Sequence, residues 1–448
     1  MKEIKRDSFT SKLGVITATV GSAIGLGNIW RFPYETGTHG GAAFLLVYIF
    51  FVVVVGVPLI CSEFIIGRAS QCNVHRAIRK LEKKGRKWHW AAYLGILSSL
   101  MVLSYYSVVA GWTMDYCAQS VCGTFSDMSR GDFSVYFTEF STNSFRPVVW
   151  VVVFLACNYL ILRRGLKNGI ERMSNLMTPL LFVLLIAFCI KSLTLPQAKQ
   201  GLEFLFVPNF KAITPSVLLG AMGQAFFSLS LGVGVLMTYA SYFQKDVRLV
   251  RSASIIGVLD TTFAVLAGLI IFPALFSFGM EPEAGPRLVF EVLPAIFSQI
   301  AGGSVWSALF FFLLFVASIT STFSMAEISI CFFSEEFKMS RERATVLTIG
   351  IAMFFGVLCA LSFGPLADVT FFGKTIFNLF DFTTANILMP LCGIFFSIFA
   401  GWMIDRKTLD DQLTNNGKLR LYSRSAIIFC LRYVAPIAIT AVFLFNLF

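Results

Sequence analysis

Apolar residues form long blocks along this chain, and most polar residues lie between the blocks. Each block has about twenty residues, the length at which an α-helix crosses the hydrocarbon core of a bilayer. The blocks lack the two-residue alternation of outer-membrane strands, so the pattern predicts helices, whose backbone groups are satisfied internally. The eleven predicted spans are 14–37, 41–67, 89–120, 147–163, 169–191, 214–244, 248–279, 304–334, 343–362, 375–402 and 424–447.

The composition also indicates an integral membrane protein. Of the 448 residues, 56% are hydrophobic and 14% are charged, whereas globular domains average about 25% charged residues. The start, MKEIKRDSFTSKLG, lacks a short apolar core with a small-residue cleavage site, so we expect the first helix to be retained. No linker or low-complexity segment divides the chain, which predicts one domain over residues 1–448.

The net charge of +11 is concentrated in alternate loops, and the intervening loops are balanced. The positive-inside rule therefore predicts a cytoplasmic N-terminus, and an odd helix count puts Phe448 outside. This distribution explains the charge without a nucleic-acid partner. The basic residues that follow the second span are Arg76, Arg79, Lys80, Lys83, Lys84, Arg86 and Lys87.

The remaining polar chemistry is sparse. The ten cysteines have no CxxC or metal-ligand spacing, and most are interpreted as buried thiols. His75 and His89 lie in or beside the basic loop, and we expect them to be solvated. The absence of an N-x-S/T sequon is compatible with a bacterial inner-membrane protein. No phosphate loop, metal-ligand cluster or nucleophile–base arrangement is recognisable, which argues against an enzyme.

Two spans contain residues that disfavour a continuous helix. The first holds GSAIGLGNIWRFPY (21–34), and the sixth holds GQAFFSLSLGVGVLMTYASY (223–242). The two spans are five apart, so they start on opposite sides of the membrane. Interrupted helices at matching places in opposed halves are a feature of inverted-repeat transporters, including the family named below. The alternative is that glycines only allow close helix packing, but Asn28, Arg31 and the repetition in span 6 favour breaks.

A break in a helix has a chemical use. It frees carbonyl groups that can ligate a cation, and it leaves half-helix N-termini whose partial positive charge favours a carboxylate. Such backbone is tolerated at membrane depth only where protein encloses it or where it lines a cavity. The two breaks therefore predict a mid-membrane binding site.

Further motifs are GGAAFLLVYIFFVVVVGVPL (40–59), SYYSVVAGW, GQAFFSLSLGVG, GPRLVFEVLP, ASITSTFS and NLFDFTTAN. Together with GSAIGLGNIWRFPY they resemble the neurotransmitter:sodium symporter family, particularly its bacterial amino-acid transporters, over nearly the whole chain. The resemblance implies an all-α membrane fold with helices 1 and 6 broken at mid-membrane. Helices 1–5 (about 14–191) and 6–10 (about 214–402) would form two inverted repeats, followed by an extra helix (424–447). It also implies sodium-driven import by alternating access, with helices 1, 2, 6 and 7 tilting as a bundle against a scaffold.

The resemblance implies two sodium sites built from oxygen ligands, which a hard cation prefers. The first would comprise the Ala23 carbonyl and the side chains of Asn28, Ser228 and Asp260. The second would comprise the carbonyls of Gly21, Ile24 and Ala317 and the hydroxyls of Thr320 and Ser321. For the hydroxyls of ASITSTFS, the alternative is ordinary interhelical hydrogen bonding.

Asp260 departs from many relatives, which have asparagine there. In chloride-dependent relatives a serine one turn later helps to bind the anion, and Ala264 occupies that position here. An ionisable group at mid-span is by default a functional hypothesis. We hypothesise that Asp260 supplies the negative charge that chloride supplies elsewhere and that it takes up a proton on the return step, which predicts chloride-independent transport. The alternative is a carboxylate at a helix end facing water.

The substrate implied by the resemblance is an amino acid. The family's amine transporters have an aspartate at the position of Gly25, whereas an amino acid brings its own carboxylate. Val233 replaces a phenylalanine of a leucine-selective relative, so we expect a roomier pocket that accepts tryptophan, tyrosine, phenylalanine or leucine. The predicted substrate contacts are Ala23, Gly25, Gly27, Val102, Tyr106, Phe227, Ser228, Ser230, Val233, Ser321 and Met325.

Charge pairs are predicted to gate the site. Arg31 and Asp381 match the family's outer pair, with Phe227 as an aromatic lid. Arg6 and Glu335 match the inner latch, which Tyr242 would brace. Two rival functions remain open: an ion channel, and an amino-acid sensor with the transporter fold. We expect membrane lipid and a small-molecule substrate as partners, and a monomer that suffices for transport although an oligomer is possible.

Overall fold

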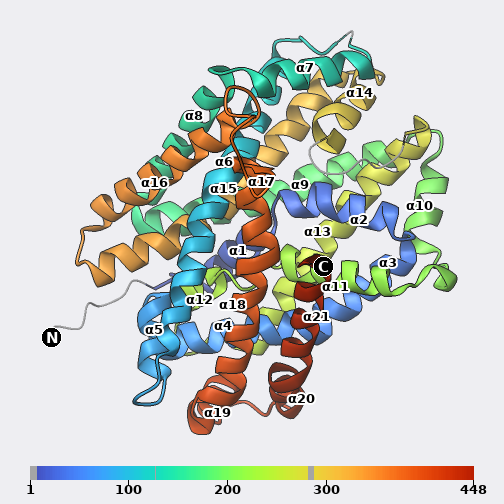
Figure 1. The fold of residues 1–448 in the computed structure, drawn as a ribbon. Coiled ribbons are helices and arrows are strands. Elements are labelled where there is room, and N and C mark those ends of the chain that lie inside the picture. Colours follow the sequence, from blue (N-terminus) through green and yellow to red (C-terminus); the bar gives the residue numbers. More distant parts are fainter. Residues whose placement is uncertain (1–7, 127, 281–286, 448) are drawn as a thin grey trace.

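The computed structural model describes residues 8–126, 128–280 and 287–447, and within these ranges it is almost entirely helical (Figure 1). A short antiparallel pair joins β1 (Thr370–Phe371) to β2 (Lys374–Thr375). The α-helices are α1 (Lys12–Ala23), α2 (Phe32–Thr38), α3 (Ala42–Phe51), α4 (Val57–Ser70), α5 (Val74–Leu81), α6 (Ala92–Val121), α7 (Arg130–Thr142), α8 (Arg146–Leu162), α9 (Arg172–Leu193), α10 (Ala198–Phe206), α11 (Pro215–Ser228), α12 (Val235–Ala240), α13 (Leu249–Ser277), α14 (Leu293–Ser298), α15 (Gly303–Glu336), α16 (Arg341–Leu361), α17 (Ile376–Phe382), α18 (Met389–Ile398), α19 (Arg406–Thr414), α20 (Arg424–Phe429) and α21 (Ala435–Leu447).

π-Helical and 3-10 helical turns join several of these α-helices, so that neighbouring helices continue as one rod. π-Helical turns occupy Gly27–Arg31, Val52–Gly56, Leu166–Glu171, Leu288–Val292, Thr383–Leu388, Phe399–Met403 and Cys430–Val434, and 3-10 turns occupy Trp88–Ala91 and Phe210–Ala212. The second span, for example, runs from α3 through one such turn into α4.

Each predicted span contains helix at the expected place. In the described ranges, eight helices are long and apolar enough to cross a membrane. The number of such spans rises to ten if each of two bent helix pairs is counted as one span. One bent pair joins α1 to α2 with a bend of 55°. The sixth span consists of α11 and α12, which are separated by residues 229–234. Both spans predicted to be interrupted are therefore broken.

The helices form two groups that meet along the middle of the molecule. In the first group, the scaffold, α6 lies along α15, and α8 and α16 pack beside them (Figure 1). In the second group, the bundle, α13 packs against both α4 and α1, and α12 packs on α4. Because α1 and α12 also contact α15, both broken spans lie at the boundary between bundle and scaffold.

Local sequence explains where the broken spans begin. The Thr214 hydroxyl accepts a hydrogen bond from the backbone N–H of Val217 (3.3 Å), and Pro215 occupies the first turn of α11, where a missing N–H costs nothing. The Ser11 hydroxyl similarly accepts the N–H of Gly14 (2.9 Å) at the start of α1. Each cap satisfies an N–H that the helix itself leaves without a partner.

Buried polar contacts fix the scaffold. The Asp115 carboxylate of α6 accepts hydrogen bonds from Arg146 (2.8 Å) and from the indole N–H of Trp150 (2.7 Å), both on α8. The Thr322 hydroxyl of α15 donates to the Asn158 side chain of α8 (2.8 Å). Interhelical hydrogen bonds of this kind average about 0.6 kcal/mol in membrane proteins, so several of them hold the group together.

Candidate functional site

The break in the first span exposes backbone amides to side chains of the scaffold. Ile24 has extended backbone (φ −70°, ψ 114°), which ends α1. The N–H of Leu26 donates to the hydroxyl of Tyr106 on α6 (3.0 Å), and the N–H of Gly25 donates to the side-chain oxygen of Asn28 (3.2 Å). A Cβ atom at Gly25 would lie 2.9 Å from the Tyr106 hydroxyl and 3.0 Å from the Ser321 hydroxyl. Glycine is therefore required here by close approach.

The break in the sixth span is a turn with three left-handed residues. Ser230, Gly232 and Gly234 have φ values of 51°, 80° and 88°. The buried Glu63 carboxylate of α4 accepts hydrogen bonds from the N–H groups of Gly232 (3.0 Å) and Met237 (3.1 Å). It thus satisfies one donor inside the break and one in the first turn of α12. The sequence analysis missed this role, although a glutamate inside the apolar run VPLICSEFIIG was a usable signal.

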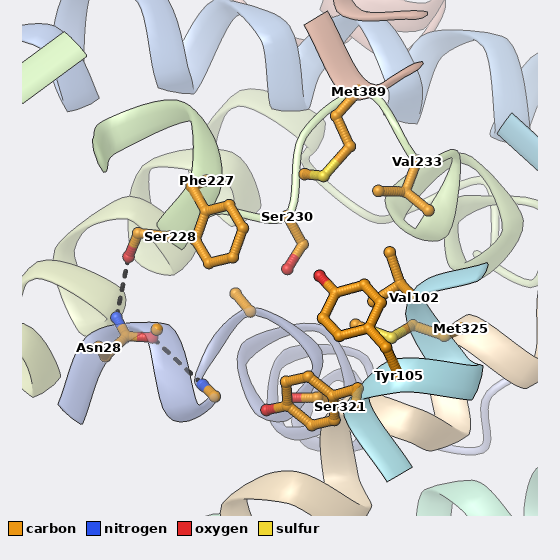
Figure 2. A pocket seen from close by; sticks show the side chains of 14 residues that line it. Asn28, Val102, Tyr105, Phe227, Ser228, Ser230, Val233, Ser321, Met325 and Met389 are labelled. Atoms are coloured by element: carbon orange, nitrogen blue, oxygen red, sulfur yellow. Dashed lines mark hydrogen bonds between the residues drawn. The ribbon is translucent and has the colours of Figure 1, made fainter. Parts of the chain in front are cut away.

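The two breaks border one cavity of about 50 Å³ (Figure 2). Every residue that the sequence predicted to contact the substrate lines it. Three further lining residues are Asn28, Tyr105 and Met389, and the last two were not predicted. Figure 2 shows the Met389 side chain of α18 pointing into the cavity beside Ser230 and Val233.

The residues predicted for the first sodium site form one hydrogen-bonded cluster next to the cavity. The Asn28 amide donates to the Ser228 hydroxyl (2.9 Å) and to the Asp260 carboxylate (2.9 Å). The Ser228 hydroxyl donates to Asp260 (2.6 Å), and so does the Tyr48 hydroxyl (3.0 Å). Ala23 lines the same cavity. Carboxylate, hydroxyl and carbonyl oxygens suit a hard cation, although the Asn28 amide would have to turn its oxygen towards the ion.

Asp260 is fully enclosed in this cluster. Asp260 is 1% exposed and lies in the middle of α13. The interpretation of a carboxylate at a helix end facing water is therefore wrong, because the neighbouring helices cover it. A buried carboxylate needs hydrogen-bond donors or a cation to offset its desolvation, and Asn28, Ser228 and Tyr48 supply the donors here.

The residues predicted for the second sodium site also meet. The Ser321 hydroxyl donates to the carbonyl of Ile24 in the break (2.9 Å) and lies 3.2 Å from the carbonyl of Ala317. The Thr320 hydroxyl donates to Ala317 as well (3.0 Å). A Cβ atom at Gly21 would lie 3.5 Å from Cβ of Thr320, so α1 and α15 touch at this point. These hydroxyls bond both within α15 and across to α1, and the same oxygens are available to a cation.

The predicted outer gate is only partly assembled. The Arg31 guanidinium lies 4.5 Å from the centroid of the Phe227 ring, where a cation is attracted by the ring face. Its ion-pair contact is with Glu35, one turn later (3.7 Å). Asp381 on α17 is exposed, and among the described residues the ion pair of Arg31 is with Glu35 and not with Asp381. The structure therefore brings Arg31 and the aromatic lid together but holds Asp381 apart.

At the opposite end of the bundle, Arg6 of the predicted inner latch lies outside the described residues. Its predicted partner Glu335, near the end of α15, accepts hydrogen bonds from the backbone N–H and the side chain of Asn73 (both 2.9 Å). Asn73 immediately precedes α5. The carboxyl end of α15 is thereby tied to the loop after the second span.

Tyr242 belongs to a neighbouring buried cluster that the sequence analysis did not foresee. Its hydroxyl donates to the Glu327 carboxylate (2.6 Å). Both terminal nitrogens of Arg341 also donate to this carboxylate (2.9 and 2.7 Å). Bidentate charge-assisted pairs of this geometry are the stronger kind of hydrogen bond. The cluster connects the end of the sixth span to α15 and α16, so Tyr242 joins bundle to scaffold through Glu327.

His75 is buried, and the expectation that it is solvated is wrong. Its residue is 6% exposed because Tyr93, His89 and Phe332 pack around its ring. Burial is the main cause that lowers the pKa of the His75 imidazole below its usual range, and the nearby Glu336 opposes this effect. His89 is partly buried and contacts Glu82, with 2.7 Å between Nδ1 and Oε1.

Comparison with known proteins identifies the architecture. The model of the sodium:neurotransmitter symporter family matches residues 6–130 and 138–448. The chain belongs to this family. It is 40% identical to the uncharacterized sodium-dependent transporter YhdH of Bacillus subtilis, over 99% of this chain and 98% of that one. It is 26% identical to the sodium-dependent serotonin transporter of Drosophila melanogaster, over 99% of this chain and 77% of that one.

A solved structure agrees over the whole fold. The crystal structure of MhsT in complex with L-phenylalanine superposes with a TM-score of 0.90 at 42% identity, covering 99% of this chain and all of that one. The fold is therefore the one expected: two inverted five-helix repeats and an eleventh helix, with helices 1 and 6 broken. The chain is a sodium-dependent transporter of the membrane and not an enzyme.

Proposed function

We propose that this transporter imports amino acids with large hydrophobic or aromatic side chains, together with sodium, by alternating access. The observation that carries this proposal is the cavity, in which both backbone breaks, several hydroxyl groups and an apolar end meet. The cavity has Gly25 where amine transporters of the family have an aspartate. A ligand that brings its own carboxylate therefore fits better than a simple amine. The phenylalanine bound by the related MhsT supports this substrate class.

The proposed pose places the two charged groups of the substrate at the backbone breaks. The carboxylate would lie near the Tyr106 hydroxyl and the amides of Gly25 to Gly27, with sodium of the first site beside it. The ammonium group would contact carbonyls such as those of Ala23 and Phe227. The substrate side chain would then extend towards the apolar wall formed by Val102, Val233, Met325 and Met389.

Binding of a bulky side chain requires that wall to move. A cavity of about 50 Å³ accommodates a few water molecules, whereas sites for drug-sized ligands measure about 300–1,000 Å³. Met325 and Met389 have flexible thioether side chains that repack readily, and the Phe227 ring is only partly buried beneath the Arg31 guanidinium. We propose that substrate enlarges the cavity by displacing these three side chains.

Two sodium ions would drive the transport. Each ion that moves inward through about 100 mV releases roughly 2.3 kcal/mol before its concentration gradient is added. We propose that Asp260 provides the fixed negative charge at the first site, which makes transport independent of chloride. When sodium leaves, the hydrogen-bond donors around Asp260 would stabilise its buried carboxylate. Protonation of Asp260 on the return step would remove the buried charge instead.

We further propose the setting of the protein. It would lie in a bacterial inner membrane, with its N-terminus in the cytoplasm and its C-terminus outside, as the distribution of basic loops predicts. The repeats would span about residues 14–191 and 214–402 within one domain, and one protomer would suffice for transport.

The test is uptake of labelled tryptophan and leucine into proteoliposomes under separately imposed sodium, proton and chloride gradients. Wild-type protein should accumulate both amino acids with sodium inward, and replacing chloride by gluconate should leave the rate unchanged. D260N should lower the apparent sodium affinity at least tenfold, and added chloride should partly restore it. The matched control is D368N, because Asp368 lies outside the site.

Three outcomes would overturn parts of this proposal. Loss of wild-type uptake without chloride would refute the role of Asp260. Binding of an amino acid without sodium-driven accumulation would favour a sensor. Flux that does not saturate and exceeds transporter rates would favour a channel.

A further inference from the structure

The last turn of α5 and the loop after it carry an unusual density of positive charge. Six cations within nine residues are all exposed: Arg79, Lys80, Lys83, Lys84, Arg86 and Lys87. We call residues 79–87 the basic loop. In the described part of the chain no ion pair is formed by any of these six side chains. The acidic residue of the loop, Glu82, is already held by His89.

An exposed aromatic stripe begins three residues after the basic loop. Trp90 is 63% exposed, Tyr93 40% and Leu97 48%. Their spacing places them on one face at the start of the third span. Tryptophan and tyrosine concentrate at the membrane–water interface, and leucine lies deeper. The stripe therefore predicts that the basic loop lies at the level of the lipid headgroups.

The basic loop is also anchored to a helix end that the gate uses. α5 leads into the loop. Asn73, the residue just before α5, donates its backbone N–H to the Glu335 carboxylate of α15 (2.9 Å). Arg76 of α5 pairs with Glu336 (2.7 Å). Both carboxylates belong to the last turn of α15, and Glu335 is the residue predicted to form the inner latch. Displacement of α5 would therefore pull on this end of α15.

We propose that the basic loop, together with Trp90 and Tyr93, is a binding surface for the phosphate headgroups of anionic phospholipids. The lipid would lie in the leaflet that the positive-inside rule assigns to the cytoplasm, and it would hold α5 against α15. Each lysine or arginine close to an anionic surface strengthens association about fivefold. The surface is independent of which substrate the transporter carries. The alternative is that these cations serve only as an orientation signal during insertion and afterwards face water.

The test compares two triple variants in nanodiscs of phosphatidylcholine with phosphatidylglycerol, where membrane orientation has no influence. K83Q/K84Q/K87Q removes three charges from the basic loop. K407Q/K418Q/R420Q removes three exposed charges from α19 and the loop that follows it, and serves as the control. All six positions are exposed, so both variants should fold, which size-exclusion chromatography checks. Native mass spectrometry of released protein then counts the retained phosphatidylglycerol relative to phosphatidylcholine.

The expected result is a drop of at least tenfold in retained phosphatidylglycerol for the basic-loop variant and less than twofold for the control. Equal losses in the two variants would show a general effect of surface charge, and no loss in either would leave only the orientation signal; both outcomes overturn the proposal. Raising the salt from 0.1 to 1 M shortens the Debye length from about 10 to about 3 Å, so it should abolish the wild-type preference, and a preference that persists would also overturn it.

A second measurement addresses the contact between α5 and α15. Hydrogen exchange of residues 74–81 in the wild type should be slower by at least threefold in phosphatidylglycerol than in phosphatidylcholine. The basic-loop variant should lose this difference. Equal exchange of the wild type in the two lipids would refute the claim that bound lipid holds α5.

Discussion

The two helix breaks perform the same topological task with different partners. In the first span, the N–H of Leu26 and the carbonyl of Ile24 bond to Tyr106 and Ser321, which lie on the scaffold helices α6 and α15. In the sixth span, the N–H groups freed by the break bond to Glu63, which lies on α4 within the bundle. One break is therefore satisfied across the boundary between bundle and scaffold, and the other is satisfied inside the bundle.

This difference indicates what each break does during transport. If the bundle tilts against the scaffold, bonds that cross the boundary must lengthen or exchange, whereas bonds inside the bundle move with it. We therefore expect the partners of the first break to change with conformation and to be replaced by substrate and sodium ions. We expect the sixth break to move as a rigid turn whose shape Glu63 maintains.

The largest effect on stability should come from Glu63. E63A leaves two buried N–H groups without acceptors, and each orphaned donor costs about 1–3 kcal/mol. We expect a clearly lower thermal unfolding midpoint, measured in detergent by differential scanning fluorimetry. E63Q retains one acceptor oxygen and should lose less. E203A is the matched control because Glu203 on α10 is exposed. An E63A protein that unfolds at the wild-type temperature would contradict the assignment of a rigid sixth break.

Tyr106 should show the opposite profile. Y106F removes the acceptor of the Leu26 N–H, which is only partly buried beside the cavity. Water in the cavity can accept this hydrogen bond instead, so stability should change by less than about 1 kcal/mol. The KM for amino-acid uptake should rise about tenfold, the equivalent of about 1.4 kcal/mol. Proteoliposome kinetics measure this change, and Y116F on the same helix is the control outside the cavity. If Y106F destabilised the protein as strongly as E63A and left KM unchanged, the contrast between the breaks would be lost.

The sequence was sufficient to predict the breaks and most of the cavity. Helix interruption leaves a local signal in glycine, asparagine and hydroxyl residues, and the motifs around Gly25 and Ser228 carry it. The hydrogen-bonded cluster at Asp260 followed from the resemblance residue by residue, and the structure assembles it. These features depend on glycine, polar and ionisable residues, which are recognisable inside an apolar span without knowledge of what packs around them.

Features set by packing could not be predicted in this way. Met389 is an ordinary apolar residue of α18, and only the approach of that helix to the sixth break brings it into the cavity. His75 seemed a solvated loop residue because the aromatic rings that bury it come from distant segments. The Arg31–Asp381 pair was predicted as a contact, but its distance depends on the position of α17 relative to the first span.

Met389 should change selectivity with the smallest free-energy effect of the three. A Cβ at Gly232 would collide with the backbone oxygen of Met389, so the backbone of α18 packs directly against the sixth break. The Met389 side chain enters the cavity. M389A removes most of the Met389 side chain from the apolar wall of the cavity. It should raise the preference for tryptophan over leucine by up to about tenfold, within the 1–3 kcal/mol that apolar pockets discriminate. M389L nearly conserves the volume and should keep the wild-type ratio.

The measurement is the ratio of kcat/KM for the two amino acids, so that a general loss of activity cancels. M353A is the control, because it removes the same side chain from α16, away from the cavity. An unchanged ratio in M389A would mean that α18 only supports the sixth break. A shift of equal size in M389L would mean that Met389 acts through its shape or sulfur instead of its bulk, and the rigid turn would then set the pocket size alone.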